Sequence, residues 1–197
     1  MTTKRQKNFA LEASCWHSST EVIFMYSKEI VTPSEVNVEI SGEKVKVSGP
    51  KGSLERIIET KEMKIEKKDN RIVVSSESER RKTKALVGSI AAHIKNLMEG
   101  VTKGFTYKLK VVYSHFPIQI KVEKDKVVFS NFLGERTPRI AKIVGSTQVK
   151  IEGADITVSG LDLEDAGQTA SNLELATRRT GYDKRVFQDG CYIMSRE

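Results

Sequence analysis

The sequence has little of what builds covalent or metal-bound frameworks. Its 197 residues include only two cysteines and three histidines. Cys15 and Cys191 lie far apart, with no second Cys or His at ligand spacing. This pattern excludes a disulfide framework and a structural zinc site. We therefore expect a reducing compartment and no bound metal.

Long hydrophobic runs are also missing. The longest apolar run near the N-terminus is Val22 to Tyr26, and Glu12, His17 and Glu21 interrupt the stretch before it. A signal peptide or a membrane-spanning helix needs a longer apolar segment than this. We expect a soluble protein that is not secreted and has no membrane partner.

Catalytic patterns are scarce. None of the three histidines has a candidate nucleophile in an activating context, and His93 lies beside apolar positions, as structural histidines do. The sequence contains neither a G-x-G-x-x-G nor a Walker pattern. Acidic residues cluster at Asp162, Glu164 and Asp165, where the start of a predicted helix favours negative charge without any catalytic role. We expect no enzymatic activity and no cofactor.

The sequence does have an excess of positive charge. Lys and Arg number 33 against 26 Asp and Glu, which gives a net charge of +7. Such a balance favours a polyanionic partner, with nucleic acid ahead of an acidic membrane, although a charge that only serves solubility would look the same.

An internal repeat organises the chain. An alternating apolar segment ends at a Gly in residues 45–52 and again in residues 127–134, at an offset of 82. Residues 64–66 and 72–75 recur in the same way as residues 150–152 and 156–159, and each pair precedes a helical stretch. The two halves are therefore interpreted as copies of one module of about 80 residues.

Each copy shows hairpins followed by a helix. In the first copy, apolar alternation predicts strands over 36–40, 45–47, 61–67 and 71–75. Ser76 and Glu79 form a capping-box pattern, and Gly100 is expected to end the helix. The helix is expected to bury a stripe of apolar residues, namely Leu86, Ile90, Ile94, Leu97 and Met98. A last strand carries Phe105, Tyr107, Leu109 and Val111 on one face.

The second copy repeats this order. Strands are predicted over 118–123 and, after a turn at 124–125, through residues 127–134. Two more strands are predicted around 149–152 and 156–159. A shorter helix before Gly181 buries Ala166, Ala170, Leu173 and Thr177. The predicted fold class is α+β, with two tandem similar modules, each a mostly antiparallel sheet with one packed helix. We divide the chain into an N-terminal extension (1–31), a first module (32–112) and a second module (113–197). Residues before Tyr26 are expected to be dispensable, and Met25 is an alternative start.

Positive charge is distributed unevenly between these modules. Residues 32–112 carry 17 basic and 11 acidic residues, whereas residues 113–197 carry 12 of each. Bulk charge therefore favours the first module as the RNA binder. However, all six arginines of the second half fall in two segments, and arginine is suited to forked phosphate contacts. The candidate RNA-binding residues there are Arg136, Arg139, Lys142, Arg178, Arg179, Lys184, Arg185 and Arg196. Scattered surface salt bridges are the alternative, and the end of the predicted helix could by itself explain Arg178 and Arg179.

One further candidate lies in Gly49-Pro50-Lys51-Gly52. This is the G-x-x-G pattern of a KH module, whose loop clamps a nucleic-acid backbone. A KH loop joins two helices, however, and here a strand precedes the pattern, so a turn explains both glycines more simply. Lys51, at the tip, is a further candidate for a phosphate contact.

Taken together, the motifs resemble a known family. Residues 45–54, the run His115-Phe116-Pro117-Ile118, residues 131–136 and the ending 183–193 are similar to those of the universal L-six family of large-subunit ribosomal proteins. The ending resembles the archaeal and eukaryotic branch, whose eukaryotic member is called L-nine. The resemblance covers residues 27–197, so the segment before it has no family counterpart, and Cys191 stands where an aliphatic residue is more usual.

The resemblance implies a specific function. Family members fold as two similar α+β domains, bind large-subunit rRNA mainly through the C-terminal domain, and sit near the sarcin–ricin loop beside the docking site of translational GTPases. It implies that residues 133–142 and 178–196 face RNA, that neighbouring ribosomal proteins are partners, and that the protein works in cytoplasmic ribosomes. A free-standing RNA-binding adaptor is the alternative, and an enzyme is a distant third.

Overall fold

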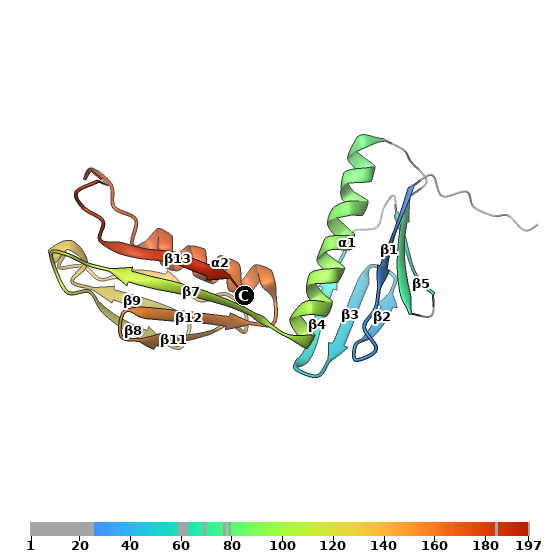
Figure 1. Cartoon of the computed structure of the whole chain (residues 1–197), viewed down its shortest axis with the longest axis horizontal. Coiled ribbons are helices and arrows are strands. Elements are labelled where there is room, and N and C mark those ends of the chain that lie inside the picture. Colours follow the sequence, from blue (N-terminus) through green and yellow to red (C-terminus); the bar gives the residue numbers. More distant parts are fainter. Residues whose placement is uncertain are drawn as a thin grey trace, which may run out of the picture.

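The computed structural model describes residues 26–58, 63–68, 70–76, 78, 80–183 and 185–196 (Figure 1). Two α+β units follow each other, each with one helix and mostly antiparallel strands, as the repeat predicts. Among the described residues, neither long helix has the length and hydrophobicity to cross a bilayer.

The first unit contains two three-stranded antiparallel sheets and a long helix, α1. One sheet has the order β2-β3-β4 and the other has the order β1-β6-β5. The elements are β1 (Tyr26–Val31), β2 (Asn37–Ser41), β3 (Lys44–Gly49), β4 (Gly52–Ile57), β5 (Met63–Lys68), β6 (Arg71–Ser76) and α1 (Arg81–Thr102).

The second unit repeats this order and adds a strand. Its sheets have the orders β10-β9-β8 and β11-β12-β7-β13, so β7 takes the place that β1 has in the first unit. The elements are β7 (Phe105–Val112), β8 (Gln119–Glu123), β9 (Lys126–Ser130), the 3-10 turn η1 (Phe132–Gly134), β10 (Arg139–Lys142), β11 (Gln148–Glu152), β12 (Asp155–Gly160), α2 (Leu163–Ala176) and β13 (Gly190–Arg196).

Two predicted module boundaries are wrong. Tyr26–Val31 is no extension, because it pairs along its whole length with β6 and buries Ile30 in the core. Phe105–Val112 does not close the first module, because it pairs with β12 and β13 of the second. Sequential numbering hid this arrangement, since β7 directly follows α1 in the chain. From here on, the first module is residues 26–104 and the second module is residues 105–196.

Helix α1 differs from its prediction at both ends and on one turn. Ser76 ends β6, and the residue before the helix, Arg80, makes no side-chain capping bond, so the predicted capping box is wrong. Gly100 lies buried inside the helix, which continues to Thr102. Val87 is buried and Leu86 is 50% exposed, whereas the rest of the predicted stripe is buried. All four predicted core positions of α2 are buried.

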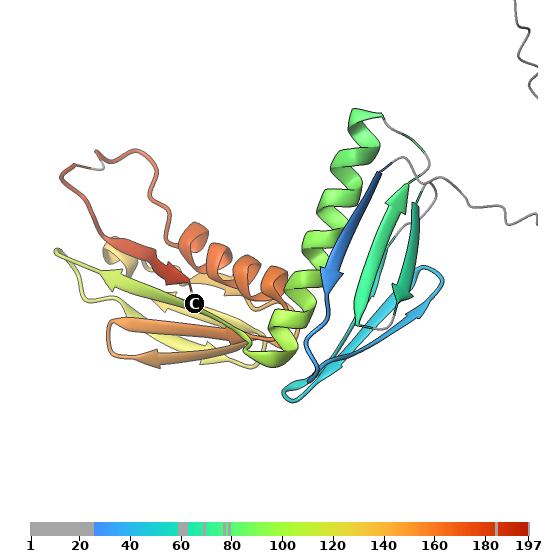
Figure 2. The same ribbon diagram turned by 45° about the vertical axis from the view of Figure 1, so that its right-hand side comes forward.

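The modules meet where α1 ends and α2 begins (Figure 2). Leu161, in the link between β12 and α2, lies against two glycines of the first module. A Cβ at Gly52 would lie 3.0 Å from Leu161 Cδ1, and one at Gly100 would lie 2.1 Å from the Leu161 carbonyl oxygen. Gly100 therefore permits a close helix-to-backbone approach and does not act as a helix cap.

Candidate nucleic-acid interface

The predicted basic segment 133–142 is not one long loop. Arg136 follows the turn η1, but Arg139 and Lys142 belong to β10, which pairs with β9. No strand was predicted here, and the equivalent strand of the first copy, β4, was missed as well. The extra residues between β9 and β10 make the 3-10 turn, whose Phe132 is buried.

Arg139 is used inside the protein. Its guanidinium binds Glu135 through two hydrogen bonds, with Nη2–Oε1 at 2.6 Å and Nε–Oε2 at 2.8 Å, and it lies over the ring of Phe132. Its Nη1 also donates to the carbonyls of Ala176 and Arg178, where α2 ends. The hydrogen bond from Arg139 lowers the pKa of Glu135. Arg139 therefore fixes β10 to the end of α2. From the sequence, Arg178 and Arg179 were the cations expected to interact with this helix end.

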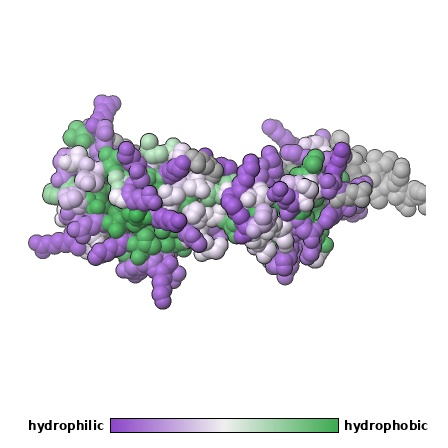
Figure 3. All heavy atoms as spheres, turned by 60° about the horizontal axis from the view of Figure 1, so that its bottom comes forward, coloured by the Kyte–Doolittle hydropathy of each residue, from purple (hydrophilic) through white to green (hydrophobic). Residues whose placement is uncertain are grey.

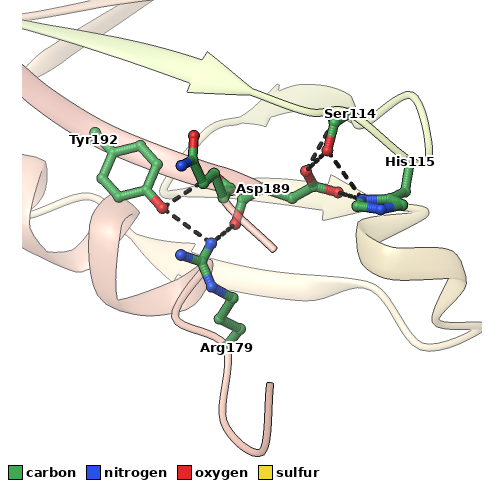
Figure 4. A network of polar contacts seen from close by, with 6 residues as sticks. Ser114, His115, Arg179, Asp189 and Tyr192 are labelled. Carbon is green, nitrogen blue, oxygen red and sulfur yellow. Dashed lines mark hydrogen bonds and ion pairs between the residues drawn. The ribbon is translucent and has the colours of Figure 1, made fainter. Parts of the chain in front are cut away.

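Arg179 is also structural (Figure 4). Its Nη1 donates to the Asp189 carbonyl at 2.5 Å and to the Tyr192 hydroxyl at 3.0 Å. Tyr192 in turn donates to the carbonyl of Gln188. The side chain therefore ties the segment after α2 to the start of β13.

A serine, a histidine and an aspartate meet beside this tie (Figure 4). Asp189 is 1% exposed and accepts hydrogen bonds from the backbone and hydroxyl of Ser114, both at 2.8 Å. Burial opposes ionisation of Asp189, but the bonds from Ser114 and His115 outweigh it and lower the pKa of this carboxyl. The Ser114 hydroxyl lies 3.0 Å from His115 Nδ1, the same nitrogen that faces Asp189 at 3.4 Å. A hydrolytic triad needs its serine on the other ring nitrogen, so this cluster holds β13 against β7 and does not activate a nucleophile.

The other candidate residues that the structure describes in the second module have exposed side chains. In the part of the chain that the structure describes, none of their charged groups makes a hydrogen bond or ion pair. This unpaired cation set consists of Arg136, Lys142, Arg178, Arg185 and Arg196. Lys184 lies outside the described residues.

These cations do not form one cluster. Arg136 follows Glu135, the carboxylate partner of Arg139, and the Arg178 carbonyl accepts from Arg139 at the end of α2. The carbonyl of Lys142, on β10, accepts from Asn172 on α2. Arg196 pairs with Tyr107, which lies against Gly167 near the start of α2. Arg178 therefore lies just after the last residue of α2, whereas Arg196 lies beside a strand that contacts the first half of this helix.

Lys51 lies at the tip of the hairpin between β3 and β4, where Gly49 pairs with Gly52. The turn interpretation of this motif is confirmed and the KH interpretation is wrong, since the motif joins two strands. The Lys51 backbone donates to Val101, and its ammonium donates to the carbonyl of Lys103. Lys51 thus satisfies carbonyls at the end of α1, while its side chain stays exposed.

Sequence analysis missed a polar contact between the modules. Arg56 on β4 forms an ion pair with Glu164 at the start of α2, at 2.6 Å. His93 Nδ1, on α1, lies 3.2 Å from the same carboxylate. Asp162, in contrast, caps α2 as predicted by accepting from the Glu164 backbone. No sequence pattern links Arg56 with Glu164, because only the tertiary arrangement of the two copies brings them together.

The second module also exposes more hydrophobic surface (Figure 3). Among the described residues, large exposed hydrophobics of the first module are Val31, Ile57 and Leu86. Those of the second are Val112, Tyr113, Phe116, Val122, Ile140, Leu175, Tyr182, Val186, Ile193 and Met194.

Cys191 is not reactive, because burial raises the pKa of its thiol to about 12. Within the described ranges, no group of His, Cys, Asp and Glu side chains could hold a metal ion.

Comparisons with known proteins match both modules. The family model described as Ribosomal protein L6 matches residues 32–104 and 116–190. The chain is 49% identical over 164 residues to the large ribosomal subunit protein uL6 of Methanothrix thermoacetophila, covering 83% of this chain and 93% of that protein. It is 48% identical over 171 residues to uL6 of Aeropyrum pernix (86% and 94% covered). It is 47% identical over 185 residues to uL6 of Archaeoglobus fulgidus (91% and 93% covered).

Proposed function

The chain belongs to the ribosomal protein L6 family and is a structural protein of the large ribosomal subunit, and we propose that it binds large-subunit rRNA mainly through its second module. The proposed place is near the sarcin–ricin loop, beside the docking site of translational GTPases. The protein works by binding without turnover. Contacts to phosphates fix its position on a folded RNA, whose shape supplies the specificity.

The observation that carries this proposal is the unpaired cation set of the second module. Some surface cations of this module face an acid of the same protein, as Lys126 faces Glu123. Arg136, Arg178 and Arg185 face none among the described residues. Arginines held open in this way are suited to charge-assisted bonds with phosphate oxygens.

The exposed hydrophobic residues of the second module support a second kind of contact. Leu175 and Ile140 are 55% and 54% exposed, and both line a groove between β10 and α2 beside Lys142. Surface that is apolar and cationic at once fits a crowded assembly in which protein and RNA neighbours both pack against the same module. We therefore propose that neighbouring ribosomal proteins contact the surface around this groove.

Reconstitution into large subunits tests the proposal. Subunits lacking this protein are mixed with the full chain, sedimented and probed by chemical footprinting of the rRNA. We expect stoichiometric recovery with the large subunit and protection near the sarcin–ricin loop. Recovery only in light fractions would favour a free-standing adaptor, and protection elsewhere on the rRNA would refute the proposed place.

A further inference from the structure

The junction between the modules contains a polar groove, and among its lining residues only Lys51 belongs to the predicted site. Its volume is about 470 Å³, and both modules line it. Its polar lining comprises Lys51, Lys103, Thr106, Ser146, Gln148 and Ser159, and none of its lining residues is acidic. We propose that this groove binds the phosphate backbone of an RNA strand, an inference that rests on the proposed rRNA-binding function.

The charges around the groove favour an anion. The end of α1 points its last carbonyls here, which alone would repel phosphate. The Lys51 ammonium satisfies the carbonyl of Lys103 and so cancels that effect. The exposed Lys103 side chain has no partner in the described part of the chain and supplies the net positive charge.

The floor of the groove is shaped for close approach. Gly104 has φ +75°, and a Cβ there would meet the Lys51 Nζ at 3.5 Å and the Gly160 carbonyl at 3.6 Å. A glycine is therefore required by the backbone, and it also leaves the floor open. The walls present hydroxyl and amide groups, which donate hydrogen bonds to phosphate and ribose oxygens.

The groove continues as a polar track on one face of a sheet. Thr106, Ser159 and Gln148 are register partners across β7, β12 and β11, so their side chains share a face. Two residues further along, about 7 Å away, the next row on that face is Lys108, Thr157 and Lys150.

The row after that contains Lys110 between Asp155 and Tyr192, with Glu152 next to Asp155. These carboxylates end the favourable stretch. The track therefore accommodates a short length of one strand, bound at the junction and over two rows of the sheet.

The test measures binding of the full chain to a large-subunit rRNA transcript across several salt concentrations. Lys103→Gln should reduce the salt slope by about one counterion, and Lys103→Arg should restore it. Gln148→Glu, which adds a negative charge to the wall, should weaken binding about tenfold. All variants are first checked for normal thermal unfolding.

Two variants on α1 serve as controls. Lys82→Gln removes an exposed lysine at the far end of the helix, about 30 Å from Lys103, and Ser89→Glu adds a charge on an exposed turn. Both should bind as the unaltered chain does. If the unaltered chain binds but Lys103→Gln and Gln148→Glu behave like the controls, the groove proposal fails alone. If the unaltered chain does not bind rRNA, the proposed function fails and the groove proposal fails with it.

Discussion

The two modules share one topology and differ in how they use their charges. In the first module, several basic side chains are paired within the protein, whereas Lys28, Lys44, Lys82 and Lys103 are exposed and have no partner in the described part of the chain. Lys46 faces Glu55, Arg71 faces Glu29, and Lys95 faces Glu99. In the second module, Arg139 and Arg179 are used structurally, but the five residues of the unpaired cation set stay open. We therefore propose that the unpaired arginines of the second module, and not the net charge of a module, mark the RNA-binding surface.

The modules differ as well in what holds their edges. The second module has an additional strand, β13, which Asp189 and Arg179 fasten at its start. The first module has instead a longer helix, whose last turns contact the second module through Gly100. The second copy therefore has a wider sheet, and the first copy has a longer helix that reaches the junction.

The largest expected effect comes from adding a side-chain methyl group where the two modules touch. Gly100→Ala puts a Cβ against the backbone of Leu161, which cannot move as a side chain can. We expect a loss of about 2–3 kcal/mol in the free energy of unfolding, measured by urea titration. The matched control is Gly88→Ala on the same helix, where a Cβ meets nothing within 4 Å. This variant should gain up to about 1 kcal/mol, and equal effects of the two substitutions would mean that the close contact does not exist.

Asp189→Asn should affect the second module alone. It removes the charge that Ser114 and His115 bond to in a buried place, so we expect a loss of about 2 kcal/mol at pH 7. Because the pKa of Asp189 is lowered on folding, the charge stabilises the protein above the unfolded pKa of about 3.9. That stabilisation disappears as the pH falls through the folded pKa, so the two proteins should converge in strong acid. Asp125→Asn, in an exposed turn, is the control and should show no such pH-dependent gap.

Arg139 and Arg136 should separate stability from binding. Arg139→Ala removes the clamp between β10 and α2 and should cost about 1–2 kcal/mol. Arg136→Ala should change stability by less than about 0.5 kcal/mol. In rRNA binding, Arg136→Ala should reduce the salt slope by about one. Normal rRNA binding by the Arg136 variant would show that an unpaired arginine here does not contact RNA.

The smallest effect is expected at the polar contact between the modules. Arg56 and Glu164 are both partly exposed, so their coupling in a double-mutant cycle with Arg56→Gln and Glu164→Gln should be about 0.5 kcal/mol. A coupling of several kcal/mol would show that the ion pair, and not the packing of Leu161 on the glycines, holds the modules together.

Local patterns predicted much of this fold. Strand alternation found the hairpins β2–β3, β8–β9 and β11–β12, and helical spacing found α2 with three of its four buried residues, Thr169 being the one that was missed. The predicted helix cap at Gly100 was wrong because a glycine can also lie inside a helix, where it leaves room for the backbone of a neighbouring segment, here Leu161. The assignment of β7 to the wrong module followed from chain order, which does not reveal which sheet a strand joins.

The candidate site was harder to predict than the fold. Residue type and position selected Arg139 and Arg179 alongside Arg136 and Arg178, because all are arginines in two basic segments. What separates them is tertiary: Arg139 reaches the carbonyls that end α2, and Arg179 reaches the carbonyl before β13. The junction groove could not be predicted either, since its lining comes from the β3–β4 hairpin, the end of α1 and three strands of the other module.

We propose that rRNA binds mainly through the open arginines of the second module. Its most direct test compares two triple variants of the full chain, Arg136→Gln with Arg178→Gln and Arg185→Gln, and Lys28→Gln with Lys44→Gln and Lys82→Gln. Both remove the same charge from exposed positions, the first in the second module and the second in the first module. We expect that only the triple arginine variant reduces the salt slope of rRNA binding, by about 2 to 3. An equal or larger reduction in the lysine triple would contradict it.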